Sequence, residues 1–223
     1  MRGPVIALAT LGIASGIALM APAAQAQEIN LPPAGAPPPE EPPPGWSFTA
    51  SGYWNMPRQE QSYLSAIVIA EHDKLHLEGR VNYEAMHSQS AFVGWSFSGG
   101  EKIAYKVTPI LGFVAGSIHG VIPGLEASVS AYKFDYYIEA EYLAGSVAQT
   151  PSYLYAWSEL GYRPVDWLRF GFVAQRTRIY GGDREFQRGG LLQLTYKKAT
   201  VGCYWFNPGS SEQVVITTLT LAF

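Results

Sequence analysis

Polar and apolar residues alternate along most of the chain between residues 46 and 223. The stretch "LHLEGRVNYE", residues 75–84, has leucine, glycine, valine and tyrosine at its odd positions, and charged or amide residues and a histidine at its even positions. A period of two residues indicates a β-strand with one apolar and one polar face. No part of this region keeps a helical period for three turns, so we expect an all-β fold.

The alternation divides into twelve segments that are separated by Gly, Pro, Asn, Asp and Lys. Pro109 lies inside the fifth segment and predicts a bulge or two shorter strands there, because proline cannot donate a hydrogen bond to a sheet. In the eighth segment three aromatic residues share a face with Glu159, so the pattern leaves the inward face undecided. The predicted strands are Trp46–Trp54, Tyr63–Glu71, Leu75–Glu84, Ala91–Ser98, Ile103–Gly116, Leu125–Tyr132, Tyr136–Leu143, Tyr153–Tyr162, Leu168–Thr177, Gln187–Tyr196, Thr200–Phe206 and Gln213–Phe223.

The connections between these segments alternate between short and long. Short ones such as "HDK", "KFD" and "KKA" follow every second segment, and longer ones such as "SIHGVIPG", "AGSVAQTPS" and "RIYGGDREF" lie between them. This is typical of an up-and-down antiparallel β-barrel with tight turns at one end and loops at the other. Both ends of the region fall on the tight-turn side, so the strand number is even.

Three features favour a transmembrane barrel of about 12 strands over a soluble one. Segments of roughly 9 to 11 residues suit a tilted strand that crosses a membrane. Charged residues make up only 15% of the chain, against about 25% in ordinary soluble domains, and the polar faces hold many Gly, Ser and Thr. Aromatic residues at segment ends predict a girdle at the membrane interfaces: Trp46, Trp54, Tyr83, Tyr162, Trp167 and Tyr196. The alternative is a secreted soluble β protein.

The chain ends in "TTLTLAF", with apolar residues at Leu219 and Leu221 and an aromatic residue at Phe223. This ending resembles the C-terminal assembly signal of Gram-negative outer-membrane β-barrel proteins. The resemblance implies that the last strand closes against the first, that the barrel-assembly machinery reads these three residues, and that outer-membrane lipid surrounds the barrel.

The front of the chain predicts export. Residues 1–26 hold Arg2, an apolar run and an A-x-A site, which is typical of a secretory signal peptide; an N-terminal membrane helix is the alternative. Residues 27–45 predict a periplasmic spacer, since eight of the fifteen residues 31–45 are proline and favour extended polyproline II. The alternative for 31–45 is a tether that binds a periplasmic partner. Cys203 is the only cysteine, so no disulfide forms within the chain.

The polar faces of the predicted strands would line the lumen of the barrel. The pair Glu139 and Glu141 lies on one face of a strand and is expected to meet basic residues of neighbouring strands. The predicted lumen-lining residues include more acidic than basic side chains, which predicts a weak preference for cations. The predicted lumen-lining residues are Glu78, Arg80, Glu84, Lys106, Glu126, Glu139, Glu141, Arg169 and Gln193.

These features favour a narrow passive pore for small solutes or ions. The second interpretation is a closed structural or docking barrel that binds a surface polymer or a secretion component. The third is a lipid-modifying enzyme that uses His87 and Ser88 of the loop "MHSQS", although no third group completes a catalytic set. No cofactor or metal site is recognisable, and the net charge of −3 gives no reason to expect nucleic acid as a partner.

Overall fold

The computed structural model describes residues 45–145, 151–180 and 184–223. The predicted signal peptide and all but the last residue of the predicted spacer lie outside these ranges. The described residues contain no helix that is long and apolar enough to cross a membrane. They form thirteen β-strands: β1 (Ser47–Pro57), β2 (Tyr63–His72), β3 (Leu75–Val81), β4 (Ser88–Trp95), β5 (Phe97–Gly99), β6 (Ala104–Gly116), β7 (Gly120–Ala131), β8 (Phe134–Gly145), β9 (Tyr153–Val165), β10 (Leu168–Ile179), β11 (Arg184–Tyr196), β12 (Ala199–Phe206) and β13 (Val214–Ala222).

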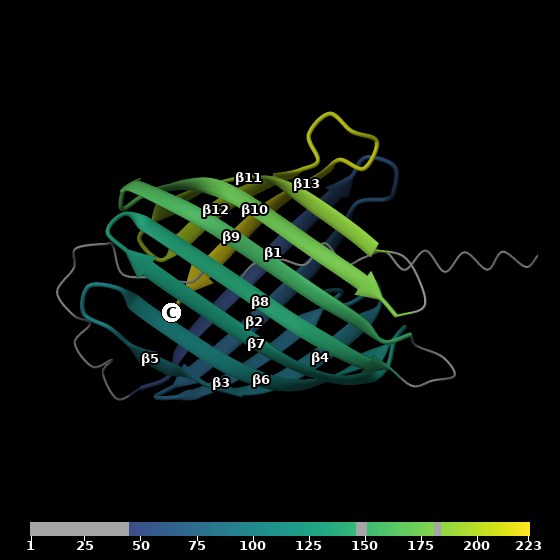
Figure 1. The fold of residues 1–223 in the computed structure, drawn as a ribbon, viewed down its shortest axis with the longest axis horizontal. Coiled ribbons are helices and arrows are strands. Elements are labelled where there is room, and N and C mark those ends of the chain that lie inside the picture. Colours follow the sequence, from purple (N-terminus) through teal and green to yellow (C-terminus); the bar gives the residue numbers. More distant parts are fainter. Residues whose placement is uncertain (1–44, 146–150, 181–183) are drawn as a thin grey trace, which may run out of the picture.

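The strands form one closed antiparallel barrel (Figure 1). Apart from β4 and β5, each strand pairs with its neighbour in the chain, and β1 pairs with β13 to close the sheet. The short β5 continues the line of β4, and both pair with β6, so the wall has twelve strands. The prediction of an all-β, up-and-down antiparallel barrel of about 12 strands is confirmed.

The seam of the barrel joins the two ends of the strand region. Nine residue pairs connect β1 with β13, from Thr49 opposite Ala222 to Pro57 opposite Val214. The last residue takes part, because the backbone N–H of Phe223 donates to the carbonyl of Phe48 at 2.9 Å. The implied closure of the last strand against the first is therefore present.

One end of the barrel carries tight turns and the other carries loops. Three of the tight turns begin with a residue in the left-handed region: Asp73, Tyr132 and Lys197 have φ angles of 53°, 55° and 54°. The C-terminus lies among these turns, at the left of Figure 1. We call this the short-turn end and the opposite one the long-loop end.

Apolar and aromatic side chains cover the outer surface of the barrel, and the inside holds polar side chains together with a cluster of buried apolar and aromatic ones. Trp46, Trp54, Trp167 and Tyr196 of the predicted girdle are exposed. Tyr83 was predicted to belong to it and does not, because only 1% of its surface is exposed and it lies inside the barrel. An apolar outer surface on a closed barrel is the arrangement that a lipid environment requires.

The prediction of a bulge or a break at Pro109 is wrong for its own strand, since β6 runs without interruption from residue 104 to residue 116. The interruption lies in the neighbouring strand, between β4 and β5 at Ser96. Proline has no N–H to donate, so the ladder between the two strands is broken opposite Pro109. The N–H of Ser96 instead donates to the carbonyl of Lys74 at 2.7 Å.

Most strand boundaries differ from the predicted ones by a few residues, and two of these differences change where residues lie. β3 ends at Val81, because Asn82 has a φ of 54° and turns the chain out of the strand. Glu84, which was predicted within this strand, therefore lies in the connection to β4. β7 begins at Gly120, five residues before the predicted start, since Val121 and Ile122 already alternate between the outer and the inner face.

Candidate functional site in the barrel lumen

Buried ionisable side chains fill the interior of the barrel, and their carboxyl groups outnumber their cationic groups. Two arginines organise them into two clusters, which we call the Arg80 cluster and the Arg169 cluster. The buried ionisable residues are Glu78, Glu84, Glu126, Asp135, Glu139, Glu141 and Glu159 on the acidic side, and His76, Arg80 and Arg169 on the basic side.

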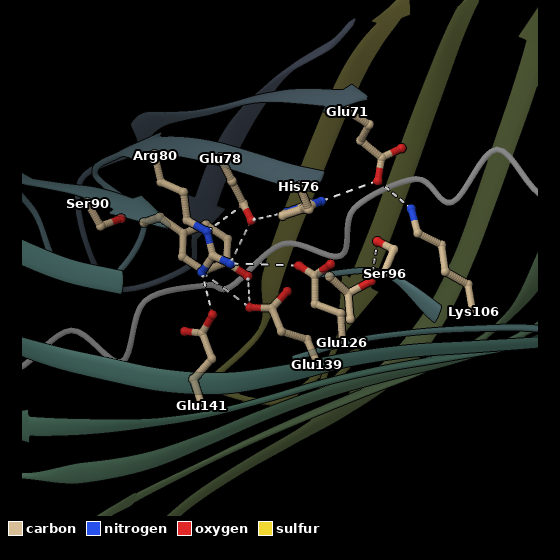
Figure 2. Close-up of polar contacts among 12 residues, drawn as sticks. Glu71, His76, Glu78, Arg80, Ser90, Ser96, Lys106, Glu126, Glu139 and Glu141 are labelled. Carbon is tan, nitrogen blue, oxygen red and sulfur yellow. Dashed lines mark hydrogen bonds and ion pairs between the residues drawn. The ribbon is translucent and has the colours of Figure 1, made fainter. Parts of the chain in front are cut away.

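In the Arg80 cluster, one guanidinium group contacts carboxylates from three parts of the wall (Figure 2). Its Nε lies 2.6 Å from Oε1 of Glu78 on the same strand, β3. Its Nη1 lies 2.8 Å from Oε1 of Glu141 and 3.4 Å from Oε1 of Glu139, which both project inward from β8. Glu84, in the connection after β3, contacts the same nitrogen at 3.5 Å. The planar fork of arginine suits several carboxylates at once.

Aromatic rings hold this guanidinium group in place. It lies 4.4 Å from the ring centre of Tyr83 and 4.2 Å from that of Phe92, distances that permit cation–π attraction. The hydroxyl of Tyr83 donates to Oε1 of Glu139 at 2.8 Å, and that of Tyr137 donates to Oε2 of Glu139 at 3.2 Å. Arg80 is itself only 1% exposed, so its side chain occupies the interior and not an aqueous vestibule.

A line of polar contacts leads from Arg80 towards the short-turn end (Figure 2). Glu78 contacts Nε2 of His76 at 3.3 Å, and Nδ1 of His76 contacts Glu71 at 3.3 Å. Glu71 in turn pairs with Lys106. The side chains of Glu71 and Lys106 are each about one third exposed. The line therefore connects the buried centre with the water at one mouth.

Three residues of the Arg80 cluster could hold a metal ion. His76, Glu78 and Glu126 offer one nitrogen and two oxygen atoms that all lie within 4.8 Å of one another. Nitrogen and carboxylate donors of this kind suit a divalent cation. A bound ion would share Glu78 with Arg80. This set could not be predicted from the sequence, because Glu126 lies on β7 and reaches the other two residues only in the folded barrel.

The Arg169 cluster joins β8, β9, β10 and β11. Nε of Arg169 donates to Oδ1 of Asp135 at 2.9 Å, and Nη1 donates to Glu159 at 2.6 Å and to Gln193 at 2.8 Å. The amide of Gln193 continues to the hydroxyl of Tyr204 at 2.9 Å. The cluster therefore ties four neighbouring strands together through buried, charge-assisted bonds.

Large aromatic side chains fill the lumen beside this cluster. The indole N–H of Trp157 donates to Glu159 at 3.1 Å. Its ring meets those of Tyr204 and Phe206 edge to face, with centroids 5.5 and 5.3 Å apart. All three rings are at most 1% exposed. The inward face of β9, which the sequence left undecided, is therefore the face of Trp157 and Glu159.

The structure places every predicted lumen-lining residue inside the barrel. Glu78, Arg80, Glu84, Glu126, Glu139 and Glu141 meet in the Arg80 cluster, with Glu126 at its edge, 3.9 Å from the guanidinium. Arg169 and Gln193 form the second cluster, and Lys106 lies at the short-turn mouth. The expected pairing of Glu139 and Glu141 with basic residues is made by Arg80, from a strand that is not their neighbour.

Sequence reasoning missed Asp135 and Glu159, both of which bind Arg169. Asp135 was assigned to the turn "KFD", whereas the turn consists of Tyr132 and Lys133 and β8 begins at residue 134. Its spacing of two from Tyr137 and four from Glu139 was the signal that could have placed it on the inward face.

The geometry gives no support to a catalytic pair in the loop before β4. The hydroxyl of Ser88 donates to the carbonyl of Ala85 at 2.7 Å and accepts from the N–H of the same residue at 3.0 Å. These bonds make Ser88 a turn-stabilising residue. The N–H of His87 donates to the side chain of Asn82, and the φ of His87 is 62°. A general base in hydrogen-bond reach of the serine, which a nucleophile needs, is not found among the described residues.

No family model matches the chain. No curated protein matches it either. Solved structures do: a KdgM porin in complex with disordered oligogalacturonate has a TM-score of 0.60 at 9% sequence identity, over 78% of this chain and 99% of the porin. A NanC porin has a TM-score of 0.56 at 9% identity, over 79% of this chain and 98% of that one.

These matches span nearly the whole of each porin, and they leave out about a fifth of this chain. At such low identity they establish the fold and not the cargo. Together with the closed seam and the apolar outer surface, they show that the chain has the fold of the small outer-membrane porins.

Proposed function

We propose that the protein is a narrow passive channel for small solutes, with a weak preference for cations. The observation that carries the proposal is the excess of inward carboxyl groups: seven are buried in the lumen, against two guanidinium groups and one imidazole. Charged groups inside a barrel of low dielectric constant are costly, and this lumen holds them beside a cluster of apolar and aromatic side chains. A polar lumen is the usual property of barrels that pass water-soluble molecules.

The line of contacts from Arg80 to Glu71 supports a route for cations. Successive carboxyl groups along a pore lower the electrostatic energy of a cation and raise that of an anion. Here the line begins at Glu141 and Glu139 and ends at the pair of Glu71 and Lys106, whose side chains are about one third exposed. Oligogalacturonate, which is bound in one of the similar porins, is an anion. The acidic lumen therefore favours neutral or cationic cargo for this chain.

The test is a single-channel recording. The full chain is expressed in a Gram-negative host, purified from the outer membrane in detergent and inserted into a planar bilayer under a potassium chloride gradient. We expect a small, steady conductance with a reversal potential on the cation-selective side. A folded barrel that stays electrically silent would overturn the channel.

A pair of variants separates the lumen charge from the charge of the mouths. Glu139→Gln with Glu141→Gln should move the reversal potential towards the non-selective value. Glu60→Gln with Glu212→Gln removes two carboxyl groups from exposed loops and should leave it nearly unchanged. If both double variants changed the reversal potential equally, the ion selectivity would not be determined by the lumen carboxyl groups.

A closed barrel that acts as a structural or docking element is the second candidate, and the tight filling favours it. Arg80, Trp157 and Phe206 are each at most 1% exposed, so conduction requires these side chains to leave part of the cross-section free. If the wild-type protein is silent and a partner co-purifies with the full chain but not with a chain lacking residues 31–45, this second function replaces the first.

A further inference from the structure

The outer surface of the barrel carries a cluster of cationic side chains at one place. Among the strand residues whose side chains the structure describes, the outward and exposed Asp, Glu, Lys and Arg side chains are those of Arg176 and Arg178 on β10 and Arg188 on β11. The other Asp, Glu, Lys and Arg residues of the strands whose side chains the structure describes point inward. We call Arg176, Arg178 and Arg188 the arginine patch.

The patch lies towards the long-loop end of the barrel. β10 runs from the short-turn end at Leu168 to the long-loop end at Ile179. Arg176 and Arg178 are therefore the last two outward residues of β10 before the long loop. Arg188 lies opposite Ala174 in the pairing of β10 with β11. Long loops face the outside of the cell in outer-membrane barrels. The patch is therefore level with the outer leaflet and its headgroups.

The patch has no internal counter-charge among the described residues. No ion pair joins any of its three arginines to a carboxyl group there, although Arg80 and Arg169 inside the barrel are fully paired. The inward Glu185 of β11 binds Gln187 and not the patch. Three unpaired cations at the edge of a hydrocarbon layer are unfavourable without an anion from outside.

A groove begins directly beside the patch on the outer surface. Ser158 of β9 lies opposite Ala174 of β10, and Gly190 of β11 lies opposite Phe172, two residues before Ala174 on β10. These three small residues form the floor of the groove. The groove has a volume of about 540 Å³, and Arg188 lines it at one end. Its remaining outward lining is apolar or aromatic: Tyr136, Leu160 and Phe172. Phe172 is 72% exposed, which marks the groove as lipid-facing.

We propose that the arginine patch and this groove form a binding site for a phosphorylated, multiply acylated glycolipid of the outer leaflet, the lipid A part of lipopolysaccharide. The guanidinium groups bind the phosphate through paired N–H donors, and one acyl chain lies in the groove. The site is independent of conduction through the lumen.

Charge and position favour this occupant over a second copy of the chain. A symmetric dimer through this face would bring six arginines together, and like charges repel across such a contact. A glycolipid matches both features of this surface. Its anionic groups would lie level with the arginine patch, and one of its apolar chains would lie against the small residues of the groove. An ordinary anionic phospholipid is the competing occupant, and the test includes it.

The test is native mass spectrometry of the full chain, purified from an outer membrane in a mild non-ionic detergent. Titration with bisphosphorylated hexa-acyl lipid A should give a one-to-one complex. We expect Arg176→Gln, Arg178→Gln and Arg188→Gln together to weaken that complex by about tenfold or more. The matched control removes three exposed charges from the short-turn end, through Lys133→Gln, Lys197→Gln and Lys198→Gln, and should leave the affinity within about twofold.

A second variant tests the groove without touching a charge. A Cβ added at Gly190 meets only the carbonyl oxygen of Gly171, at 3.7 Å, so Gly190→Leu fits the fold and fills the floor. It should weaken lipid A binding while the folded fraction, read from heat-modifiable migration on a gel, stays the same. Wild-type binding to a dephosphorylated lipid A, or to phosphatidylglycerol, with equal affinity would overturn the proposal, as would an unchanged affinity in the triple arginine variant.

Discussion

Arg80 is the residue on which most of the buried charge depends. It neutralises part of the charge of Glu78, Glu139 and Glu141, and it lies between two aromatic rings. Buried ion pairs of this kind add little to stability when they are intact, since desolvation offsets attraction, but removing one partner leaves a buried charge without compensation.

We therefore expect Arg80→Met to lower the free energy of unfolding by about 3–5 kcal/mol. The measurement is tryptophan fluorescence during guanidinium unfolding in detergent micelles. Lys106→Met is the control, because Lys106 and Glu71 form a pair that is about one third exposed, and such pairs contribute about 1 kcal/mol or less. Similar losses in both variants would show that Arg80 is not the centre of the cluster.

Gly161 makes room for the second arginine. A Cβ at this position would collide with Nε of Arg169 and with Oδ1 of Asp135. Gly161→Ala should therefore displace the pair and cost about 1–3 kcal/mol of unfolding free energy. At Gly79, on β3, an added Cβ meets nothing within 4 Å, so Gly79→Ala should change the unfolding midpoint little. The comparison is made in the same unfolding assay, and equal stabilities would contradict the steric argument.

Among the strands, β13 has the largest consequence for assembly because it completes the wall. Its outward residues Leu219, Leu221 and Phe223 are exposed, and Phe223 bonds to the backbone of Phe48. We expect deletion of Phe223 to reduce the heat-modifiable, folded fraction in the outer membrane several-fold. Phe97→Ala, which removes a similarly exposed aromatic side chain from β5, is the control. A comparable loss of the folded fraction in both variants would mean that assembly depends on outward aromatic residues in general and not on Phe223.

On most strands the alternation was enough to predict which side chains enter the barrel, but the inward face of β9 and the place of Asp135 could not be predicted from it. Glu139 and Glu141 are two residues apart, so they share a face of any β-strand, and this can be predicted without knowing the fold. Tyr83 shows where this reasoning stops: Asn82 adopts a left-handed conformation and ends the strand, so the odd and even positions no longer correspond to outside and inside. A single backbone angle in a connection carries no periodic signal.

For the whole barrel, the sequence could not show which inward residues meet. Arg80 and Glu139 are 59 residues apart and belong to β3 and β8, and their contact depends on how the sheet curves around the lumen. Barrel diameter, strand tilt and the reach of each side chain decide such contacts together. The same holds for Arg176 and Arg188, whose shared position outside the barrel follows from the pairing of β10 with β11.

The seam between β1 and β13 also limits when the barrel can close. The ribosome makes the strand-forming region from β1 onward. The outer edge of β1 therefore stays unpaired until the nine-residue strand β13 has been exported. An mRNA that is cut short, or a protease that trims the tail, leaves a product with two unpaired edges, whatever the quality of its other eleven wall strands. Such a sheet cannot satisfy its backbone in lipid, and it remains a substrate for periplasmic chaperones and proteases. Because β13 pairs with β1, membrane insertion thus depends on a full set of wall strands.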